Sequence, residues 1–411
     1  MKILFVSQYF WPEEFLINEL VSELIDRGHE VTVLTGLPNY PDGKIFHDFL
    51  LNQSSFSRYK GSVIYRVPML PRGNSKLSLF LNYISFALSA LSIGVWKLRS
   101  QKYDTIIAFQ LSPVTVGLPA IMIRFIKKIP LLFWIQDLWP DTLQALDVIR
   151  SKLILSAIGK LVSFIYRRCD LILVQSKKFI PHVRKYLLAE QNVVYFPNWS
   201  RSVNSLKLQK PASEISSMPG YFTIMFAGNI GEAQDFPAIL AAAERLKGHT
   251  IRWLIVGEGR MENWVATEII KRDLQKCVTM LGKFPPHRMG SLFRHADALL
   301  VSLKDEPIFS LTIPSKLQTY LSTGLPVLAM LNGAGAELIL ESSSGLACKA
   351  GDHEGLAKAV LQLIKMTPEA RHAMGQKGLL LSNSEFDRNK LIDRLECLIA
   401  QVKYNSTSSI S

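Results

Sequence analysis

Cysteine is scarce in this chain of 411 residues, and the four cysteines present are far apart. Cys169, Cys277, Cys348 and Cys397 form no C-x-x-C pair. The sequence therefore indicates neither a zinc site nor a disulfide framework, and a reducing cytoplasm suits it best. The eight histidines are also scattered, with no pair at ligand spacing, so we expect no metal site.

Two catalytic signatures are missing as well. No G-x-S-x-G turn follows a strand-like run, which excludes the usual nucleophile elbow of a serine hydrolase. No Walker sequence is present, which excludes P-loop nucleotidases. Because 48% of the residues are apolar and only 20% are charged, the chain can build packed cores and global disorder is excluded too.

Acidic residues are rare in one long stretch of the chain. Residues 44–185 contain 21 basic and six acidic side chains, a local net charge of +15, whereas the whole chain carries +13. The rest of the sequence therefore has a net charge of −2. Such a one-sided basic field indicates an anionic partner, which could be nucleic acid, anionic lipid or a phosphorylated substrate.

One apolar stretch, residues 77–98, is long enough to cross a bilayer. Polar residues interrupt it at positions 78, 82, 85, 89 and 92. This spacing of three and four residues places them on one stripe of a helix. We therefore expect an amphipathic helix with an apolar face and not a spanning helix. The N-terminal residues 1–7 are apolar for too short a run to be a signal peptide, and they predict a buried strand.

Apolar runs rich in β-branched residues alternate with helical patterns along the whole chain. In the first half they predict strands at residues 2–7, 31–36, 63–67, 105–110, 131–136, 171–176 and 193–197. In the second half they predict strands at residues 222–227, 251–256, 278–281, 298–303, 326–331 and 346–349. Strand and helix alternating at this interval indicate parallel sheets with crossover helices.

The composition divides the chain into two α/β domains. Residues 201–220 are rich in Ser, Pro, Lys and Asn without an apolar period, which predicts a linker. The domains are therefore expected at 1–200 and 221–385, followed by a helix at 386–403 and a frayed tail at 404–411. Each domain is predicted to be a doubly wound, Rossmann-like parallel sheet, with ligands bound in a cleft at the carboxyl ends of the strands.

Glycine-rich turns follow the first two strands of the second domain. Gly228, Asn229 and Gly231 come directly after the strand 222–227 and shortly before a helix. Such a turn lets backbone amides approach a phosphate at the start of a helix. A tight turn without a ligand explains this sequence equally well, and for Gly257, after the next strand, a structural role is the better interpretation.

Charged residues follow the strand 298–303. Asp305 and Glu306 stand where a doubly wound sheet presents catalytic or ligand-binding side chains. Pro314 and Ser315 then begin a helix, with Lys316 in its first turn. Because a cation there opposes the helix dipole, we favour a bound diphosphate over a merely solvated lysine.

In the first domain, polar residues follow two buried strands. Gln136 and Asp137 come after the strand 131–136 and could orient sugar hydroxyls, whereas Trp139 is expected to pack in the core. Glu13 and Glu14 lie in the loop after the first strand and could contact an acceptor.

Taken together, these motifs resemble the retaining family-4 glycosyltransferases of the GT-B fold, and within them a WbuB-like branch that transfers N-acetyl-L-fucosamine. The resemblance is carried by SQYFWPE (7–13), RGHEVTVLTG (27–36), GLPNYPDG (36–43), DLWP (137–140), FPNW (196–199), AGNIG (227–231), SLKDEP (302–307) and IPSKLQ (313–318). These segments span almost the whole chain.

The resemblance implies a UDP-sugar donor, a substrate and not a cofactor, bound mainly by the second domain, and an acceptor bound by the first. The donor-binding residues implied in this way are Gly228, Asn229, Gly231, Gly257, Lys283, Pro314, Ser315, Lys316 and Thr319. Lys316, Asp305 and Glu306 would serve catalysis, while Glu13, Glu14, Gln136 and Asp137 would lie on the acceptor side. The resemblance also implies that the last helix crosses back to the first domain.

The sequence departs from the family pattern in three places. Asn229 and the pair Gln234 and Asp235 occupy the stretch around the phosphate turn where many relatives carry an Arg and a Lys, which leaves Lys316 with more of the charge. Thr319 stands where the second of two glutamates is expected, so Thr319, Gln318 or another group must bind the ribose. Gln136 stands where a histidine usually precedes the aspartate. In this family, transfer is thought to occur on one face of the sugar, with the departing diphosphate helping to deprotonate the acceptor. Metal-independent catalysis by positioning and leaving-group stabilisation would follow.

The partners implied are an undecaprenyl-diphosphate-linked acceptor and an anionic membrane surface, with no nucleic acid. We therefore expect a peripheral protein on the inner face of the cytoplasmic membrane, acting in O-antigen or capsule biosynthesis. Two alternatives remain at this point: a UDP-sugar 2-epimerase of the same architecture, or a non-catalytic protein that binds anionic lipid.

Overall fold

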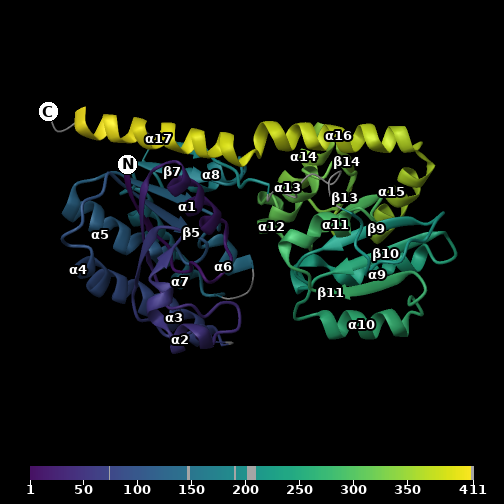
Figure 1. Cartoon of the computed structure of the whole chain (residues 1–411), viewed down its shortest axis with the longest axis horizontal. Helices are drawn as coiled ribbons and strands as arrows, with labels where there is room; N and C mark the ends of the chain where they lie inside the picture. The colour runs from purple at the N-terminus through teal and green to yellow at the C-terminus, as the bar shows by residue number, and fades with distance from the viewer. Residues whose placement is uncertain (74, 146–148, 189–190, 201–209, 409–411) are drawn as a thin grey trace. The chain divides into compact units, whose positions relative to one another are not determined.

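The structure is a computed structural model that describes residues 1–73, 75–145, 149–188, 191–200 and 210–408 (Figure 1). The chain forms two compact units. Unit 1 comprises Met1–Phe196 and Asn389–Ser411, and unit 2 comprises Pro197–Arg388. Each unit is built around its own sheet, so the two α/β domains predicted from the sequence are present.

Unit 1 has an eight-stranded sheet in the order β3-β4-β2-β1-β5-β6-β7-β8. Its strands are β1 (Lys2–Val6), β2 (Glu30–Thr35), β3 (Arg58–Tyr59), β4 (Ser62–Arg66), β5 (Thr105–Gln110), β6 (Leu131–Ile135), β7 (Leu171–Val174) and β8 (Val193–Tyr195). All pairs are parallel except β3 with β4 at the edge. β5, β6 and β7 are buried along their whole length, which explains why they read as continuous apolar runs.

Helices connect these strands. They are α1 (Leu16–Asp26), α2 (His47–Leu51), α3 (Lys76–Ser89), α4 (Val95–Lys97), α5 (Gly117–Lys127), α6 (Asp141–Ala145), α7 (Lys152–Tyr166) and α8 (Phe179–Arg184). Short 3₁₀ turns lie at Gln53–Phe56 and Val114–Val116. The long apolar segment predicted as one helix consists of α3 and α4 joined by a π-helical turn, Ala90–Gly94.

The last helix, α17 (Arg388–Ser408), belongs to unit 1 from Asn389 onward. Four of its apolar side chains are buried: Leu391, Ile392, Leu395 and Ile399. Arg27 fixes it by an ion pair with Glu396, with an Nη1 to Oε2 distance of 2.8 Å. The helix runs to Ser408 where the composition predicted a frayed tail, while Phe386, predicted to start it, lies in the core of unit 2.

Unit 2 has a six-stranded, wholly parallel sheet in the order β11-β10-β9-β12-β13-β14. Its strands are β9 (Phe222–Ala227), β10 (Ile251–Val256), β11 (Val278–Gly282), β12 (Ala298–Ser302), β13 (Val327–Met330) and β14 (Gly345–Cys348). Its helices are α9 (Phe236–Arg245), α10 (Glu262–Lys271), α11 (Met289–Phe293), α12 (Pro307–Leu311), α13 (Ser315–Leu321), α14 (Ala334–Ser342), α15 (His353–Lys365) and α16 (Pro368–Glu385), with 3₁₀ turns at Glu232–Gln234 and Pro286–Arg288.

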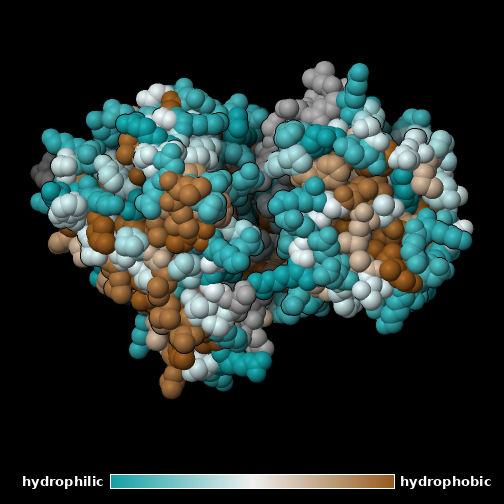
Figure 2. Space-filling view, turned by 60° about the horizontal axis from the view of Figure 1, so that its bottom comes forward, coloured by the Kyte–Doolittle hydropathy of each residue, from teal (hydrophilic) through white to brown (hydrophobic). Residues whose placement is uncertain are grey.

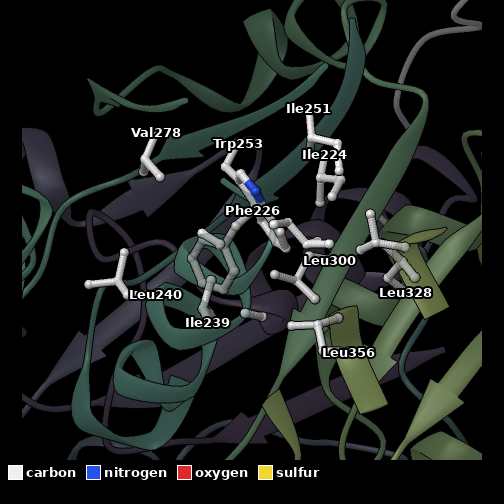
Figure 3. Close-up of a cluster of buried hydrophobic side chains, with 14 of the residues drawn as sticks. Ile224, Phe226, Ile239, Leu240, Ile251, Trp253, Val278, Leu300, Leu328 and Leu356 are labelled. Carbon is white, nitrogen blue, oxygen red and sulfur yellow. The ribbon is translucent and has the colours of Figure 1, made fainter. Parts of the chain in front are cut away.

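The two faces of this sheet carry separate cores, because successive side chains of a strand point to opposite faces. Phe226 and Trp253 belong to one core, which Figure 3 shows against Leu240 and Leu356. Met225 and Leu254 belong to the other core, which contains Leu317 of α13. The strand order reverses between β9 and β12, so this is the position where a doubly wound sheet binds its ligand.

The described part of the predicted linker packs on unit 2. Ala212 is buried, and its N–H donates to the carbonyl of Ser291 at 3.1 Å. Arg252 donates to the carbonyl of Ser216 at 2.7 Å. Residues 210–220 of the predicted linker therefore pack on unit 2, because isolated Ala and Ile side chains between polar residues are buried there, which periodicity does not reveal. Residues 201–209 lie outside the described residues.

Candidate active site

The carboxyl ends of β9 and β12 separate at the reversal of strand order. These strands pair only at Ala298 with Ile224 and at Leu299 with Met225. Beyond that point the hydroxyl of Tyr320 on α13 takes the place of a ladder partner for Ala227. It accepts from the Ala227 N–H at 2.8 Å and donates to the Ala227 carbonyl at 2.9 Å. The buried backbone is thus satisfied while the strands diverge.

The turn after β9 is held against the turn after β10. Gly228 donates its N–H to the carbonyl of Val256 at 2.9 Å, and Ile230 donates to the carbonyl of Glu258 at 2.9 Å. Gly257 has a φ of +136°, and a Cβ there would lie 1.9 Å from the Gly228 carbonyl oxygen. Only glycine allows this approach, so Gly257 positions the 228–231 turn.

Lys316 reaches this turn from the first turn of α13. Its Nζ lies 3.9 Å from the centroid of the Phe226 ring, and a Cβ at Gly228 would stand 3.3 Å from the same Nζ. The residue as a whole is half-buried, but Nζ itself is shielded from solvent and has no hydrogen-bond partner among the described residues. Burial lowers the pKa of Lys316 to about 7. A shielded amine without an acceptor indicates a place for an anion.

Asp305 lies at the same edge of the sheet, just beyond β12. Its Oδ1 accepts a hydrogen bond from Nδ2 of Asn332 at 2.8 Å, and Oδ1 of Asn332 accepts from the Ala350 N–H at 3.2 Å. Polar groups after β12, β13 and β14 are therefore linked in a row. Asp305 is exposed, and Glu306 is half-buried with its carbonyl accepting from the Phe309 N–H.

The other predicted donor-binding residues occupy different environments. Lys283 is exposed and forms an ion pair with Glu258, so its charge is not reserved for a ligand. Ser315 is exposed, and its carbonyl accepts from the hydroxyl of Thr319 at 3.4 Å. Pro314 caps α13 in an extended conformation, and Asn229 is exposed in its turn.

Gln318 is a more unusual residue of α13. Its side chain is wholly buried, yet neither its amide nitrogen nor its amide oxygen has a partner among the described residues. A buried amide without partners is costly, so Gln318 is a candidate ligand-binding group beside Thr319.

Asp137 lies at the carboxyl end of β6 in unit 1. Its carboxylate accepts from the hydroxyl of Thr142 and from Nε1 of Trp139, the latter at 3.2 Å. Burial raises the pKa of Asp137, with these hydrogen bonds opposing the rise. Trp139 is buried as expected and lies edge-on to Tyr83 at 5.8 Å between ring centroids.

The two glutamates after β1 have different surroundings. Glu13 is 3% exposed, and its carboxylate accepts from the backbone N–H groups of Phe10, Asn39 and Tyr40. We therefore assign Glu13 a structural role in holding this loop, in place of the predicted contact with an acceptor. Glu14 is exposed, and Gln136 is half-buried with its carbonyl accepting from Nε2 of Gln175 at 2.8 Å.

In unit 2, the structure places Gly228, Lys316 and Gly257 together at one edge of the sheet. Sequence reasoning did not find Tyr320 or Asn332. Tyr320 carries no local signal, because its partner Ala227 is 93 residues away. Asn332 could have been found by its place two residues after β13. Within the described residues, no group of three or more His, Cys, Asp or Glu side chains is arranged to hold a metal ion.

Comparison with known families gives both units a chemical identity. Residues 16–199 match the model of the Glycosyl transferase 4-like domain, and residues 212–380 match that of the Glycosyl transferases group 1. Both halves of the chain are glycosyltransferase domains. The first match lies in unit 1 except for residues 197–199, and the second match lies wholly in unit 2.

Relatives of this glycosyltransferase cover most of its length. The chain is 26% identical over 348 residues to the colanic acid biosynthesis glycosyl transferase WcaI of Escherichia coli (strain K12). The aligned region covers 79% of this chain and 82% of WcaI. It is 24% identical over 397 residues to the amylovoran biosynthesis glycosyltransferase AmsK of Erwinia amylovora, with 88% and 90% covered.

Among solved structures, Anabaena HepE in complex with UDP and glucose is similar with a TM-score of 0.68. The identity is 16%, and the similarity covers 98% of this chain and all of HepE. At this identity the likeness shows the fold alone. Together with the two parallel sheets, it confirms the predicted GT-B fold class.

Proposed function

We propose that this protein is a retaining glycosyltransferase that moves a sugar from a UDP-sugar to a lipid-linked acceptor during assembly of a bacterial surface polysaccharide. The names of WcaI and AmsK, which refer to colanic acid and amylovoran biosynthesis, support the polysaccharide. The UDP in the HepE structure supports the donor nucleotide. For the sugar we propose N-acetyl-L-fucosamine or a related deoxy-aminohexose, on the resemblance described above.

The observation that carries this proposal is the shielded Nζ of Lys316. It lies beneath the glycine turn of unit 2, at the reversal of strand order, without a hydrogen-bond acceptor among the described residues. A diphosphate would supply that acceptor and would favour the charged amine. In the 228–231 turn the N–H groups of Gly228, Ile230 and Gly231 already donate within unit 2, so the Asn229 N–H is the amide that would share the same negative charge.

In the mechanism we propose, the bond between the sugar and the diphosphate breaks as the acceptor hydroxyl attacks on the same face of the sugar. The hydroxyl proton passes to an oxygen of the departing diphosphate, so neither a protein nucleophile nor a metal is required. Lys316 stabilises the charge that develops on this leaving group. Asp305, held by Asn332, and the neighbouring Glu306 orient the sugar hydroxyls.

On the acceptor side we propose Asp137, with Gln136 and Glu14 as further candidates. The carboxyl of Asp137 is fixed by Thr142 and Trp139 at a strand end, and burial favours its protonated form. It is therefore suited to orient a sugar hydroxyl by hydrogen bonding and less suited to act as a strong base.

We further propose that the acceptor is linked to undecaprenyl diphosphate and that the protein works at the inner face of the cytoplasmic membrane. The net charge of +15 over residues 44–185 supports an anionic surface as its partner.

A donor panel tests this function. Purified protein is incubated with a range of UDP-sugars, and UDP release is measured with and without a lipid-linked acceptor. We expect release from one UDP-deoxy-aminosugar that rises strongly when the acceptor is added. Release of a 2-epimer without an acceptor would support an epimerase, and no release from any donor would contradict the proposal.

A further inference from the structure

Helix α3 buries the polar side chain of Asn82 with Phe86 and Ala87, and it leaves other large apolar side chains exposed. Asn82 is wholly buried, accepting from Nε2 of Gln8 at 2.7 Å and donating to the Leu70 carbonyl at 2.6 Å. Leu77 and Phe80 on the same helix are 67% and 56% exposed. A helix that faces water usually carries polar side chains at such exposed positions.

The neighbouring helices α4, α5 and α7 also expose large apolar side chains, and α5 contacts both α4 and α7. The exposed set on these three helices is Trp96, Met122, Phe125, Ile126, Leu153, Ile154 and Phe164. Two of them are among the most exposed hydrophobic side chains described, Leu153 at 84% and Phe125 at 78%. Figure 2 shows hydrophobic side chains gathered over this part of the chain. Contiguous apolar surface of this kind usually marks a binding face.

The charges of these helices identify the partner. Residues 76–97, 117–127 and 152–166 contain six basic side chains and no acidic one. Lys152 and Lys160 are exposed on α7, next to the exposed Leu153. Arg124 is paired with Asp170, which leaves five basic side chains on these helices beside the apolar ones. This combination matches the chemistry of an anionic bilayer, in which apolar side chains enter the acyl boundary and lysines remain at the headgroups.

A shallow groove between α4 and α5 has the same character. Trp96, Ile123 and Ile126 line it, with Arg99 and Lys127 also present in its wall. The Arg99 guanidinium lies 4.2 Å from the centroid of the Trp96 ring. Tryptophan beside a cation is the combination found at the level of lipid headgroups.

Residues 76–97 also form a helix long and apolar enough to cross a membrane. Crossing would require the Asn82 side chain to leave its partners Gln8 and Leu70, and Phe86 and Ala90, which are wholly buried, to leave the core. That loss favours a helix lying along the surface.

We infer that the outward faces of α3, α4, α5 and α7, here called the docking face, lie together in the headgroup region of an anionic bilayer without crossing it. The inference rests on the proposed function only for the membrane location. Beyond that location, the docking face of unit 1 makes the contact with the bilayer and unit 2 makes none.

Vesicle binding by the full chain tests the docking face. The probe is a set of vesicles of phosphatidylglycerol and phosphatidylcholine, compared with vesicles of phosphatidylcholine alone. Phe125→Glu is compared with its control Ile270→Glu, which changes a residue 64% exposed on α10 of unit 2. The double variant Lys152→Glu and Lys160→Glu is compared with Lys365→Glu and Lys377→Glu, two exposed lysines of unit 2.

We expect the wild type to bind the anionic vesicles and both controls to bind nearly as well. Phe125→Glu should weaken binding at least ~10-fold, since it removes an aromatic side chain that is exposed in the free protein and would be buried in the bilayer. The double lysine variant should weaken it at least ~30-fold, since each basic residue near an anionic surface contributes about fivefold. Because all these positions are exposed, the variants should keep the wild-type unfolding temperature.

Equal binding by the wild type and both docking-face variants would overturn the inference. Binding that only detergent reverses, and not high salt, would show an inserted helix and would overturn it too. Turnover with a detergent-solubilised acceptor is measured separately. Loss of vesicle binding with turnover intact supports the docking face, whereas absence of turnover in every variant and in the wild type would contradict the proposed function alone.

Discussion

The amine of Lys316 faces the ring of Phe226 at 3.9 Å instead of a hydrogen-bond acceptor. The two residues come from opposite sides of the sheet, since Phe226 belongs to one core and the neighbours of Lys316 on α13 belong to the other. The lysine therefore reaches across the carboxyl edge of the sheet at the reversal of strand order. Its position is costly for the protein alone and favourable for a complex with an anion.

Replacing Lys316 by methionine should stabilise the protein. Its pKa of about 7 is below the value of about 10.4 expected in the unfolded chain. Between these pH values the unfolded state binds a proton that the folded state does not, so the free energy of unfolding of the wild type rises with pH across this window. Below about pH 7 both states hold the proton, and the folded state carries the full cost of burying the charged amine. Urea unfolding should show Lys316→Met more stable by ~4 kcal/mol at pH 7 and by little near pH 10. A variant less stable than the wild type at pH 7 would indicate a structural lysine.

Tyr320→Phe should destabilise unit 2 by about 1–3 kcal/mol, because the N–H and carbonyl of Ala227 would lose their partner in a buried position. Thermal unfolding measures the loss. Tyr221→Phe is the control, since Tyr221 is 38% exposed and its change should leave stability nearly the same. Similar unfolding temperatures for both variants would refute the bridging role of Tyr320.

Gly257→Ala should impair donor binding, because the new Cβ would collide with the Gly228 carbonyl and displace the turn. Gly248→Ala is a matched control: Gly248 also has a positive φ, of +86°, but no atom lies within 4 Å of the position of its Cβ. In both variants an alanine is held at a positive φ, which lowers the free energy of unfolding by about 1 kcal/mol. Titration with UDP should show a loss of affinity only for Gly257→Ala, and equal affinities would separate Gly257 from the site.

Removing residues 389–411 should destabilise unit 1 by on the order of 5 kcal/mol and lower its solubility, because the partners of Leu391, Ile392, Leu395 and Ile399 in unit 1 would become exposed. Removing only residues 404–411 should change neither property. Unfolding temperature and the yield of soluble protein measure both effects. A well-behaved protein ending at residue 388 would show that α17 contributes little to unit 1.

The alternation of apolar runs was enough to predict both sheets and the position of the glycine turn. The expectation that Lys316 lies near that turn came from the resemblance to the GT-B glycosyltransferases; it agrees with a crossover topology, which brings strand ends to one edge. Tyr320 could not be predicted, since its partner Ala227 is distant in sequence and is brought close only by packing. Asn332 was missed although its place two residues after β13 could have indicated it.

The orientation of α3 shows a different limit of sequence reasoning. The spacing of its polar residues predicted an amphipathic helix, but periodicity does not say which stripe faces the protein. The structure places Asn82 inside, where Gln8 and the Leu70 carbonyl satisfy it, and leaves Leu77 outside. For Glu13, the sequence could not distinguish a ligand-binding carboxylate from one that closes a loop, because Asn39 and Tyr40 are 26 and 27 residues away.

Lys316 is proposed to bind the diphosphate of the donor, and calorimetric titration of the protein with UDP at pH 8 measures this contact. Repeating the titration in buffers of different ionisation enthalpy gives the number of protons taken up. We predict uptake of up to about one proton by the wild type, because a nearby diphosphate raises the lowered pKa of Lys316. Lys316→Met should lose this uptake and bind UDP ~10- to 100-fold more weakly. Equal affinity and equal proton uptake in the two proteins would show that Lys316 does not bind the diphosphate.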